Sequence, residues 1–482
     1  MTSDEPRATF RDPAGSLRFE GDLVVRTIAP DARAEVLELL ASPFCQLMQK
    51  RGDLIGAEID DSGERLVLRH PRIAIPSYPW EWTPSQWIAA ADLTLDLCEE
   101  ALRNGWILKD ATPLNVLFNG PRPIFVDILS FERRDSARGN FAGKDFKQVD
   151  SSLWLAYGQY VRTFLLPLLM DRLLHWPLAL SLFRRDGLEP AECFAALGWR
   201  RRLSRAALFP ITLPTLLDRR KPADAPSAQD EIASQNKPRK IDPEVATSIL
   251  QRTLRILRRR THRALLRSAS SNWSDYTQTL THYTAEETRQ KLDWVRDALE
   301  SARPSRVLDV GANTGEFSAL AASCGADVVA IERDQASADR LYRMARARNL
   351  SIHTLHADLA RPTPAVGWLN SESLALLPRL AAQFDLVLLL AVIHHLLLME
   401  QIPLAQIIEL CHRLSRRHLI VEWVPVSDPM FQSLLRGREA LYGQLSEDDL
   451  LAACAGRFRL LDRNALANGR VLLLFERIDS AD

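Results

Sequence analysis

The sequence predicts an α/β fold for the C-terminal half of the chain and a mixed α+β fold for the N-terminal half. In the C-terminal half, short apolar runs alternate with helical patterns beyond Arg303, and a loop carrying two glycines follows the first run. Such alternation is typical of a mostly parallel sheet with helices on both faces. The predicted strands are residues 307–310, 328–331, 352–355, 386–390, 419–421, 458–461 and 471–475.

The composition is that of an ordinary globular protein. The 482 residues correspond to two or three domains of about 150 residues each, and 61 basic residues balance 61 acidic ones. A net charge of zero excludes a global field that would recruit nucleic acid or an anionic membrane, so any such attraction must be local. None of the six cysteines forms a Cys-x-x-Cys pair, which argues against a zinc ribbon or a thioredoxin-like site. With no apolar signal segment at the N-terminus, a cytoplasmic location is expected.

A polar segment divides the chain. Residues 219–242 contain no Phe, Trp, Tyr, Leu or Val, so they cannot bury enough apolar surface to offset the entropy of ordering. The predicted organisation is an accessory domain over 1–218, a linker over 219–242, a helical lead-in over 243–300 and the α/β domain over 301–482. The accessory domain would help to present a substrate.

The N-terminal half predicts strands and then helices. Strands are expected at 23–28, 66–70, 115–118 and 123–127, and a helix over 86–104 that Thr83 or Ser85 could cap. Residues 153–217 are mainly helical in pattern, with proline interruptions. The most apolar stretch is 164–183. It contains two charges and two prolines, which favours buried or partly interfacial helices over a membrane span.

The sharpest motif is the loop after the first strand of the α/β half. Asp309, Gly311, Asn313 and Gly315 follow the apolar run in the pattern Asp-x-Gly-x-x-x-Gly, and a helix begins near Glu316. The glycines let the backbone approach a ligand, and the helix start offers free N–H groups. The pattern differs from the dinucleotide fingerprint Gly-x-Gly-x-x-Gly. An acid before the glycines suits a ligand with a cationic amine.

Two further acids follow the next two strands. Glu332 ends the second strand, where a carboxylate can accept hydrogen bonds from ribose hydroxyls. Asp358 follows the third strand, where it could accept a hydrogen bond from an adenine amino group.

Together these residues resemble the class I S-adenosylmethionine-dependent methyltransferases. The resemblance covers residues from about 272 to 475 and implies a Rossmann-like, seven-stranded sheet whose last strand is antiparallel. It also implies that S-adenosylmethionine is the cofactor. The resemblance assigns the methionine end of the cofactor to Asp309, Gly311, Asn313 and Gly315, the ribose to Glu332 and the adenine to Asp358. The alternative is a nucleotide-binding fold with another ligand or with none.

The predicted catalytic residues follow the fourth strand. His394 and His395 follow it, and in this fold the carboxyl end of that strand faces the transferred methyl group. A neutral imidazole could take a proton from an attacking hydroxyl or amine, or the pair could only shape the pocket. Glu422 lies after the fifth strand, as a second polar group on this rim or as a cap of the strand end. Aromatic residues in 272–276 and 282–283 could form a lid or pack the preceding helix.

The N-terminal half holds a second constellation. Asp110, Asn115 and Asp127 lie on a loop and a following hairpin and resemble the catalytic loop and metal-binding Asp of kinase-like phosphotransferases. The resemblance implies that Asp110 orients a hydroxyl and that Asn115 and Asp127 bind magnesium. Leu108 replaces the usual His, and no Gly-rich loop precedes it. A degenerate kinase-like domain, a coincidental hairpin and an active kinase are the alternatives. The whole arrangement also resembles bacterial nodulation-related methyltransferases.

One local basic feature stands out. The helix predicted over 245–268 carries seven arginines between Arg252 and Arg267 and no acid. It could contact RNA phosphates or an anionic lipid surface, but such a helix is more often a solvated face whose aliphatic side packs on a domain.

The sequence therefore predicts a cytoplasmic methyltransferase that uses S-adenosylmethionine and needs no metal. The methyl group would pass to an oxygen or nitrogen of an unidentified acceptor, a small molecule or a saccharide. One alternative is a kinase-like phosphotransferase or bifunctional protein using Asp110, Asn115 and Asp127. Another is a non-catalytic scaffold that binds the cofactor. The acceptor and the oligomeric state stay open.

Overall fold

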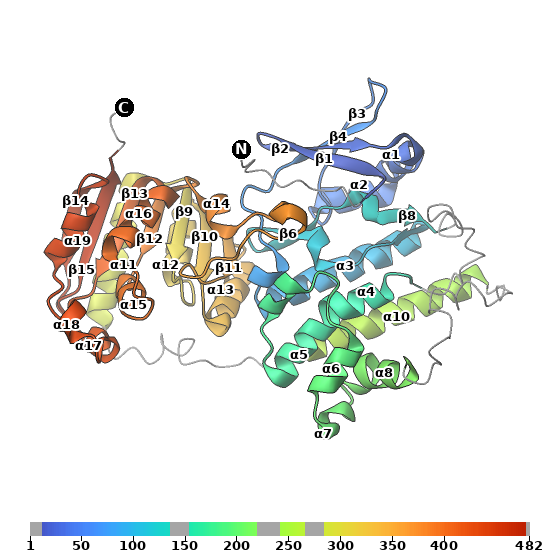
Figure 1. Ribbon diagram of the computed structural model, residues 1–482. Helices are drawn as coiled ribbons and strands as arrows, with labels where there is room; N and C mark the ends of the chain where they lie inside the picture. Colours follow the sequence, from blue (N-terminus) through green and yellow to red (C-terminus); the bar gives the residue numbers. More distant parts are fainter. Residues whose placement is uncertain (1–11, 135–153, 219–241, 266–283, 479–482) are drawn as a thin grey trace. The chain divides into compact units, whose positions relative to one another are not determined.

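The computed structural model describes residues 12–134, 154–218, 242–265 and 284–478, and the chain divides into two compact units. The N-terminal unit covers residues 5–268 and the C-terminal unit covers residues 269–482 (Figure 1). The predicted lead-in over 243–300 is divided between them, because its first helix belongs to the N-terminal unit and its second to the C-terminal unit. The predicted linker lies almost wholly outside the described residues, as do the aromatic residues predicted to form a lid. The boundaries at 218/219, 242/243 and 300/301 stay a prediction.

The N-terminal unit begins with a four-stranded antiparallel sheet in the order β1-β2-β4-β3. The predicted strands at 23–28 and 66–70 are confirmed as β2 and β4. The sheet strands are β1 (Gly15–Glu20), β2 (Leu23–Ile28), β3 (Glu58–Asp60) and β4 (Val67–Pro71), with helices α1 (Arg33–Ala41) and α2 (Pro43–Arg51) between β2 and β3.

A long helix, α3 (Pro84–Arg103), forms the centre of this unit. Thr83 caps it: its hydroxyl accepts from the N–H of Gln86, and the Gln86 side chain accepts from the N–H of Thr83. Two short antiparallel pairs follow, β5 with β8 and β6 with β7. Their bounds are β5 (Trp106–Leu108), β6 (Val116–Asn119), β7 (Arg122–Phe125) and β8 (Phe131–Arg133).

Helices complete the N-terminal unit, as predicted for residues 153–217. They are α4 (Tyr157–Tyr160), α5 (Leu166–Leu174), α6 (Pro190–Ala196), α7 (Trp199–Arg202), the π-helical turn η8 (Leu208–Thr212), α8 (Leu213–Asp218) and α10 (Pro243–Ala264). The apolar stretch 164–183 contributes the buried helix α5. No helix in the described ranges combines the length and the apolar character needed to cross a membrane.

The C-terminal unit is a seven-stranded sheet in the order β11-β10-β9-β12-β13-β15-β14. The first five strands of this row are parallel, and β15 runs antiparallel to both of its neighbours. The predicted α/β fold with an antiparallel last strand is confirmed. The strands are β9 (Arg306–Val310), β10 (Asp327–Glu332), β11 (Ile352–His356), β12 (Phe384–Leu389), β13 (Ser415–Trp423), β14 (Phe458–Ala465) and β15 (Val471–Arg477).

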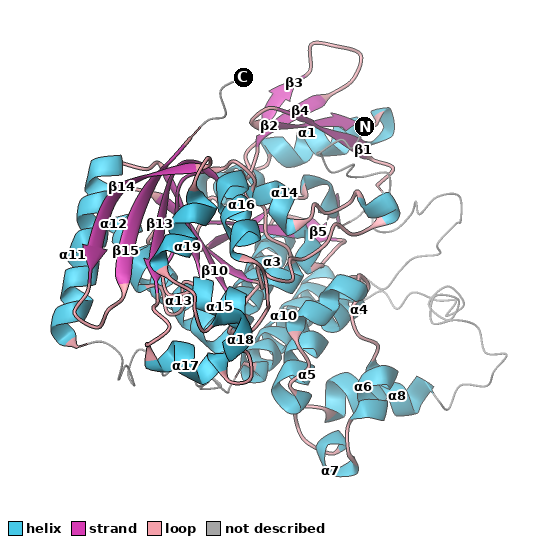
Figure 2. Cartoon of the chain, turned by 60° about the vertical axis from the view of Figure 1, so that its left-hand side comes forward, coloured by secondary structure: helices cyan, strands magenta, loops and turns pink. Residues whose placement is uncertain are grey.

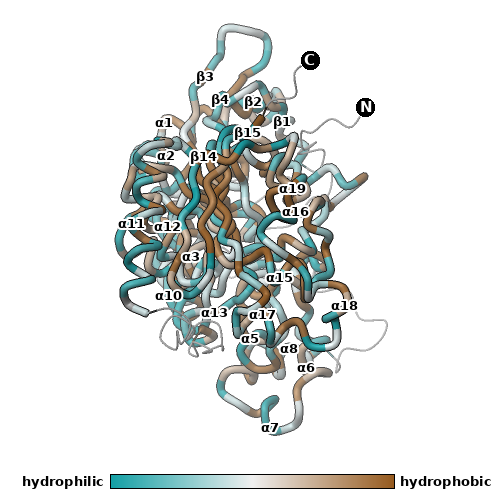
Figure 3. The backbone as a smooth tube through the Cα atoms, turned by 90° about the vertical axis from the view of Figure 1, so that its left-hand side faces the viewer, coloured by the Kyte–Doolittle hydropathy of each residue, from teal (hydrophilic) through white to brown (hydrophobic). Residues whose placement is uncertain are grey.

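Helices cover both faces of this sheet (Figure 2). Viewed along the sheet, the brown, apolar strands run between α11 and α12 on one side and α16 and α19 on the other (Figure 3). The helices are α11 (Ala285–Ala302), α12 (Glu316–Ser323), α13 (Gln335–Arg348), α14 (Leu376–Leu380), α15 (Ile393–Leu398), α16 (Leu404–Leu414), α17 (Pro429–Leu435), α18 (Glu439–Tyr442) and α19 (Glu447–Cys454). Apolar residues of α11, α12 and α13 share one buried cluster with the strands.

Candidate functional site

The loop between β9 and α12 adopts a conformation that its glycines permit. Gly311 and Gly315 have φ values of 70° and 91°, which side-chain-bearing residues rarely adopt. A Cβ atom on Gly311 would lie 2.6 Å from Cγ2 of Val392. A Cβ atom on Gly315 would lie 2.7 Å from Cγ of Leu341. The glycines therefore allow this loop to pack closely against neighbouring elements at the carboxyl edge of the sheet.

Asp309 is buried on β9 below this loop. Its carboxylate accepts a hydrogen bond of 2.6 Å from the Ser318 hydroxyl on α12. Burial raises the pKa of Asp309 to about 6, although the Ser318 hydrogen bond lowers it in part. A cationic group that binds next to this buried carboxylate would stabilise its ionised form.

Glu332 ends β10 and is tied to the backbone through both carboxylate oxygens. Oε2 accepts from the N–H of Asn313 over 2.8 Å, and Oε1 accepts from the N–H of Asp334 over 2.7 Å. Burial raises the pKa of Glu332, and these backbone hydrogen bonds oppose the rise. Each oxygen keeps a further lone pair that can accept from a ligand hydroxyl.

Asp358 follows β11, where it stabilises its own turn. Oδ1 accepts from the N–H of Ala360 over 2.9 Å, and Oδ2 pairs with Arg361 at 3.1 Å. Arg361 also pairs with Glu400 at 2.5 Å. Asp358 thus has local partners that the sequence did not reveal, and its adenine role stays a prediction.

A cavity of about 260 Å³ brings these residues together. Its walls include residues from the ends of β9, β10, β11 and β12, as expected for ligands at the carboxyl edge of a parallel sheet. The sequence-predicted residues in its lining are Asp309, Gly311, Asn313, Glu332, Asp358, His394 and His395. Gly315 is not in the lining and instead precedes α12 as its N-cap.

The two histidines begin helix α15, directly after β12. Their ring centroids are 4.2 Å apart. His394 is buried, and its Nδ1 makes no hydrogen bond within the described residues. Burial, followed by the nearby His395 and Arg470, holds the pKa of His394 well below its usual value of 6.5. Burial together with Arg333 and Arg470 lowers the pKa of His395 to about 4. Both imidazoles are therefore neutral at pH 7.

The cavity fits a ligand that has an amine at one end and a ribose at the other. The side-chain oxygen of Asn313 is buried and accepts no hydrogen bond within the described residues. Asn313 and Asp309 both line the cavity, so an ammonium group would give this oxygen and the Asp309 carboxylate a donor. Glu332 offers free lone pairs for hydroxyls. This set of hydrogen-bond acceptors matches the methionine and ribose parts of S-adenosylmethionine.

Comparison with known proteins identifies a domain in the C-terminal half. Residues 281–411 match the family model described as a methyltransferase domain. The C-terminal half carries a class I methyltransferase domain. Its cofactor is S-adenosylmethionine. The class, fold and cofactor predicted from the sequence are thereby confirmed.

Other relatives were also found. The chain is 27% identical over 486 residues to nodulation protein NoeA of Rhizobium meliloti (strain 1021), covering 97% of this chain and 95% of that protein. Magnesium protoporphyrin IX methyltransferase from Synechocystis PCC 6803 with bound SAH is 18% identical, with a TM-score of 0.30, over 40% of this chain and 84% of that one. The bifunctional kinase-methyltransferase WbdD is 20% identical, with a TM-score of 0.30, over 39% of each chain.

A buried network of four charges lies beside the cavity of the methyltransferase domain. The sequence analysis largely missed it. Lys291 of α11 pairs with Glu422 of β13 at 2.6 Å, and Arg470 pairs with Glu422 at 3.3 Å and with Asp428 at 2.9 Å. Lys291 and Arg470 line the cavity, whereas Glu422 lies outside its lining. The partners are 42 to 131 residues apart in sequence, so no local pattern could reveal them. The only sequence signal of this network was the apolar run before Glu422.

The kinase-like constellation is also brought together, within the N-terminal unit. The Asn115 amide donates to the Ser130 hydroxyl over 3.0 Å, and that hydroxyl donates to Asp127 over 2.5 Å. Arg26 of β2 pairs with Asp127 at 3.0 Å. Burial raises the pKa of Asp110, with Asp127 among the charges acting on it.

Arg26 therefore supplies a cation to Asp127, the residue that the kinase resemblance assigns to magnesium. Among the described residues no group of three or more His, Cys, Asp or Glu is arranged to hold a metal ion. The comparisons favour methyl transfer over the phosphotransferase alternative.

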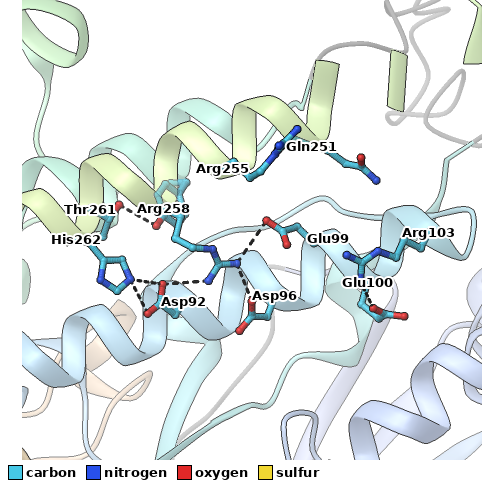
Figure 4. Close-up of polar contacts among 11 residues, drawn as sticks. Asp92, Asp96, Glu99, Glu100, Arg103, Gln251, Arg255, Arg258, Thr261 and His262 are labelled. Atoms are coloured by element: carbon cyan, nitrogen blue, oxygen red, sulfur yellow. Dashed lines mark hydrogen bonds and ion pairs between the residues drawn. The ribbon is translucent and has the colours of Figure 1, made fainter. Parts of the chain in front are cut away.

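The arginine-rich helix α10 uses part of its charge inside its own unit (Figure 4). Asp92, Asp96 and Glu99 form an acidic stripe on α3 that faces Arg258 at distances of 3.1, 2.7 and 3.5 Å. His262 also contacts Asp92, at 2.9 Å. The same helix also buries apolar residues, including Leu250, Leu254 and Leu257. Arg267 lies outside the described residues.

Proposed function

We propose that the methyltransferase domain transfers the methyl group of S-adenosylmethionine to an oxygen or nitrogen of a small-molecule acceptor, with a saccharide hydroxyl as the leading candidate. His394 is proposed as the general base. The observation that carries this role is its buried Nδ1, which has no hydrogen-bond partner within the described residues, in a ring that lines the same cavity as Asp309 and Glu332.

The proposed step needs orientation and one proton acceptor. Bound S-adenosylmethionine supplies an activated methyl group on a sulfonium. As the acceptor oxygen or nitrogen bonds to the methyl carbon, the bond between that carbon and sulfur breaks and its electrons stay on sulfur. Neutral His394 takes the proton that the acceptor loses, which is typically worth about 10²- to 10⁴-fold in rate. The cavity walls hold the reactants in line, and alignment alone can supply several kcal/mol.

The formal charge of the cavity wall that contains Lys291 and Arg470 supports a neutral acceptor. Lys291 and Arg470 line the cavity, but Glu422 and Asp428 pair with them, so this wall carries a formal charge of zero. A strongly acidic or basic acceptor would gain little electrostatic stabilisation from such a wall. A hydroxyl-rich molecule can form hydrogen bonds with it. The match to a nodulation protein along almost the whole chain is in keeping with a bacterial protein and does not name the acceptor.

The proposal is tested by measuring S-adenosylhomocysteine formation by the full chain over a panel of neutral saccharides, small alcohols, amines and carboxylic acids. We expect turnover with at least one neutral hydroxyl acceptor and a large loss of it in His394→Gln. Turnover restricted to charged acceptors would contradict the acceptor class. Tight cofactor binding without turnover on any acceptor would favour a non-catalytic scaffold.

A further inference from the structure

The N-terminal unit carries an apolar and basic surface that the methyltransferase reaction does not use. It lies on residues 199–218, which include α7, η8 and α8 (Figure 1). Trp199, Leu203 and Leu217 are 68%, 66% and 62% exposed. Phe209, Leu213 and Leu216 are exposed as well. Large apolar side chains gathered on one surface usually mark an interaction site. We name this region the α7–α8 surface.

The charges within this segment are mainly positive. Residues 199–218 contain four arginines and one acid, Asp218, which is exposed at the end of α8. Arg200, Arg201 and Arg205 are exposed, and none of the three has an acidic partner in the described part of the chain. Arg202 differs, because it lies over the Phe194 ring at 4.0 Å and donates to the Leu197 carbonyl over 2.7 Å. Three arginines are therefore left to meet an anionic partner.

The α7–α8 surface is the outer side of a folded element. Pro210, Ile211 and Thr215 are buried beneath it. The Thr212 hydroxyl donates to the Arg202 carbonyl over 2.7 Å and so ties η8 to α7. Arg260 of α10 lies over the Phe209 ring at 5.1 Å. These contacts hold the exposed side chains on a fixed support.

The neighbouring sequence cannot cover this surface with apolar side chains. Residues 219–241 contain six basic and three acidic residues, and isoleucine is their only large apolar residue type. The sequence that follows α8 therefore has an excess of basic residues. It supplies no aromatic residue or leucine that could pack on Trp199 or Leu203.

We propose that the α7–α8 surface binds the face of an anionic lipid bilayer. Exposed Trp, Phe and Leu side chains beside arginines form the pattern that inserts at the boundary between lipid headgroups and acyl chains. The arginines would contact lipid phosphates and acidic headgroups. A protein partner would be expected to meet balanced charge or a groove, and this surface presents four arginines beside a single acid. The surface lies on the membrane and does not span it, in keeping with the helices described above.

The inference is tested with the full chain and lipid vesicles. Cosedimentation is measured with vesicles of phosphatidylcholine alone and with vesicles that also contain phosphatidylglycerol, at low and high salt. One variant, R200Q/R201Q/R205Q, removes three charges from the surface, and a second, W199S/L203S, removes its apolar anchors. The matched control, R252Q/R255Q/R259Q, removes three exposed charges from α10 in the same unit. Circular dichroism and thermal unfolding of every variant check that the chain is folded.

Binding is expected with the anionic vesicles only and should weaken as salt rises. The R200Q/R201Q/R205Q variant should lose about 100-fold in affinity, from roughly a fivefold loss for each cation near a charged membrane. The W199S/L203S variant should lose binding at all salt concentrations, while the α10 control stays within about twofold of wild type.

Three results would overturn the inference. The first is no sedimentation of the wild-type chain with anionic vesicles. The second is an equal loss in the α10 control, which would mean unspecific charge attraction. The third is a concentration-dependent dimer that W199S/L203S abolishes in the absence of lipid binding, which would assign the surface to a second copy of the chain. None of these results bears on cofactor binding, so the proposed function is tested separately.

Discussion

The backbone N–H of Asn313 donates to Oε2 of Glu332 over 2.8 Å and so joins the loop after β9 to the end of β10. This bond uses the main chain of Asn313 and leaves its side-chain oxygen buried without a donor in the described residues. Asn313 itself has a φ of 51°, a left-handed conformation that Asn tolerates better than most residues. One residue thus holds the carboxylate that we propose faces the ribose, and it offers the acceptor that we propose for the amine.

Replacing Asn313 by Gly separates these two roles. Gly keeps the backbone N–H and the positive φ but removes the side-chain oxygen. We expect S-adenosylhomocysteine to bind about tenfold more weakly, because a hydrogen bond to a charged group contributes about 1.5–3 kcal/mol. The measurement is isothermal titration calorimetry. Asn349→Gly is the matched control, since Asn349 also has a φ of 51° at the end of α13. Equal losses in both variants would mean that the side chain of Asn313 does not contact the cofactor.

Cofactor affinity should depend on pH through Asp309. The free protein holds this carboxyl at a pKa of about 6, and a cationic ligand binds better to its ionised form. Affinity is therefore full above pH 7 and falls by up to about tenfold per unit as the pH drops below 6. Removing the Ser318 hydrogen bond with Ser318→Ala raises the pKa further and moves the decline to higher pH. Asp309→Asn should bind the cofactor weakly, and its affinity should not show this decline with falling pH. The dissociation constant is measured from pH 5 to 7.5, and a flat wild-type profile contradicts this account.

His394 and His395 should differ in their effect on turnover. His394→Gln is expected to lower kcat by about 10²- to 10⁴-fold, because a general base is lost. Cofactor affinity should stay within about twofold of wild type, since Asp309 and Glu332 are unchanged. His395→Gln serves as the neighbouring control and should keep kcat within several-fold. The pKa of His394 lies well below 6.5, so wild-type kcat should show no decline from its protonation between pH 6.5 and 8. Full activity in His394→Gln would remove this residue as the base.

Gly311→Ala tests the close packing of the loop between β9 and α12. The added methyl group would meet Val392 at 2.6 Å, at a φ of 70°. We expect at least a tenfold loss of cofactor affinity together with lower stability. Gly325→Ala has a φ of 92° but nothing within 4 Å of the new Cβ, so it should cost only about 1–2 kcal/mol of stability from backbone strain. Calorimetry and thermal unfolding report the two quantities. The contact with Val392 is unimportant if both variants bind the cofactor alike.

The acidic stripe on α3 should make Arg258 a structural residue. Arg258→Gln leaves Asp92, Asp96 and Glu99 facing one another without their cation, and we expect a loss of about 1–3 kcal/mol in the free energy of unfolding. Arg259→Gln changes an exposed neighbour and should stay within about 0.5 kcal/mol of wild type. Urea unfolding of the full chain measures both. Equal stability of the two variants would show that the ion pairs across α3 and α10 contribute nothing.

Much of the methyltransferase domain could be predicted because its signals are local. Asp309 in the first strand, the glycines after it and Glu332 at the end of the next strand all lie within 24 residues. Each follows from backbone geometry at the edge of a parallel sheet. The apolar strands of this sheet are buried on both faces, so they are visible as continuous runs.

The remaining contacts depend on residues that are distant in sequence. Arg26 and Asp127 are 101 residues apart, and Lys291 and Glu422 are 131 apart. The first strand, β1, alternates exposed and half-buried positions and lacks a continuous apolar run, so its sequence does not distinguish it from a loop. For α10 the sequence predicted the helix, its arginines and its aliphatic side, but not the partner of Arg258. The acidic stripe that receives Arg258 lies on a helix more than 150 residues earlier.

The central claim is that Asp309 and Glu332 form a working S-adenosylmethionine site. The most direct measurement is calorimetric titration of S-adenosylhomocysteine into the wild-type chain, Asp309→Ala and Glu332→Ala, with folding checked by circular dichroism. We predict clear binding by wild type and at least a tenfold loss in each variant. Folded variants that bind as tightly as wild type, or a folded wild-type chain that does not bind, would contradict the account.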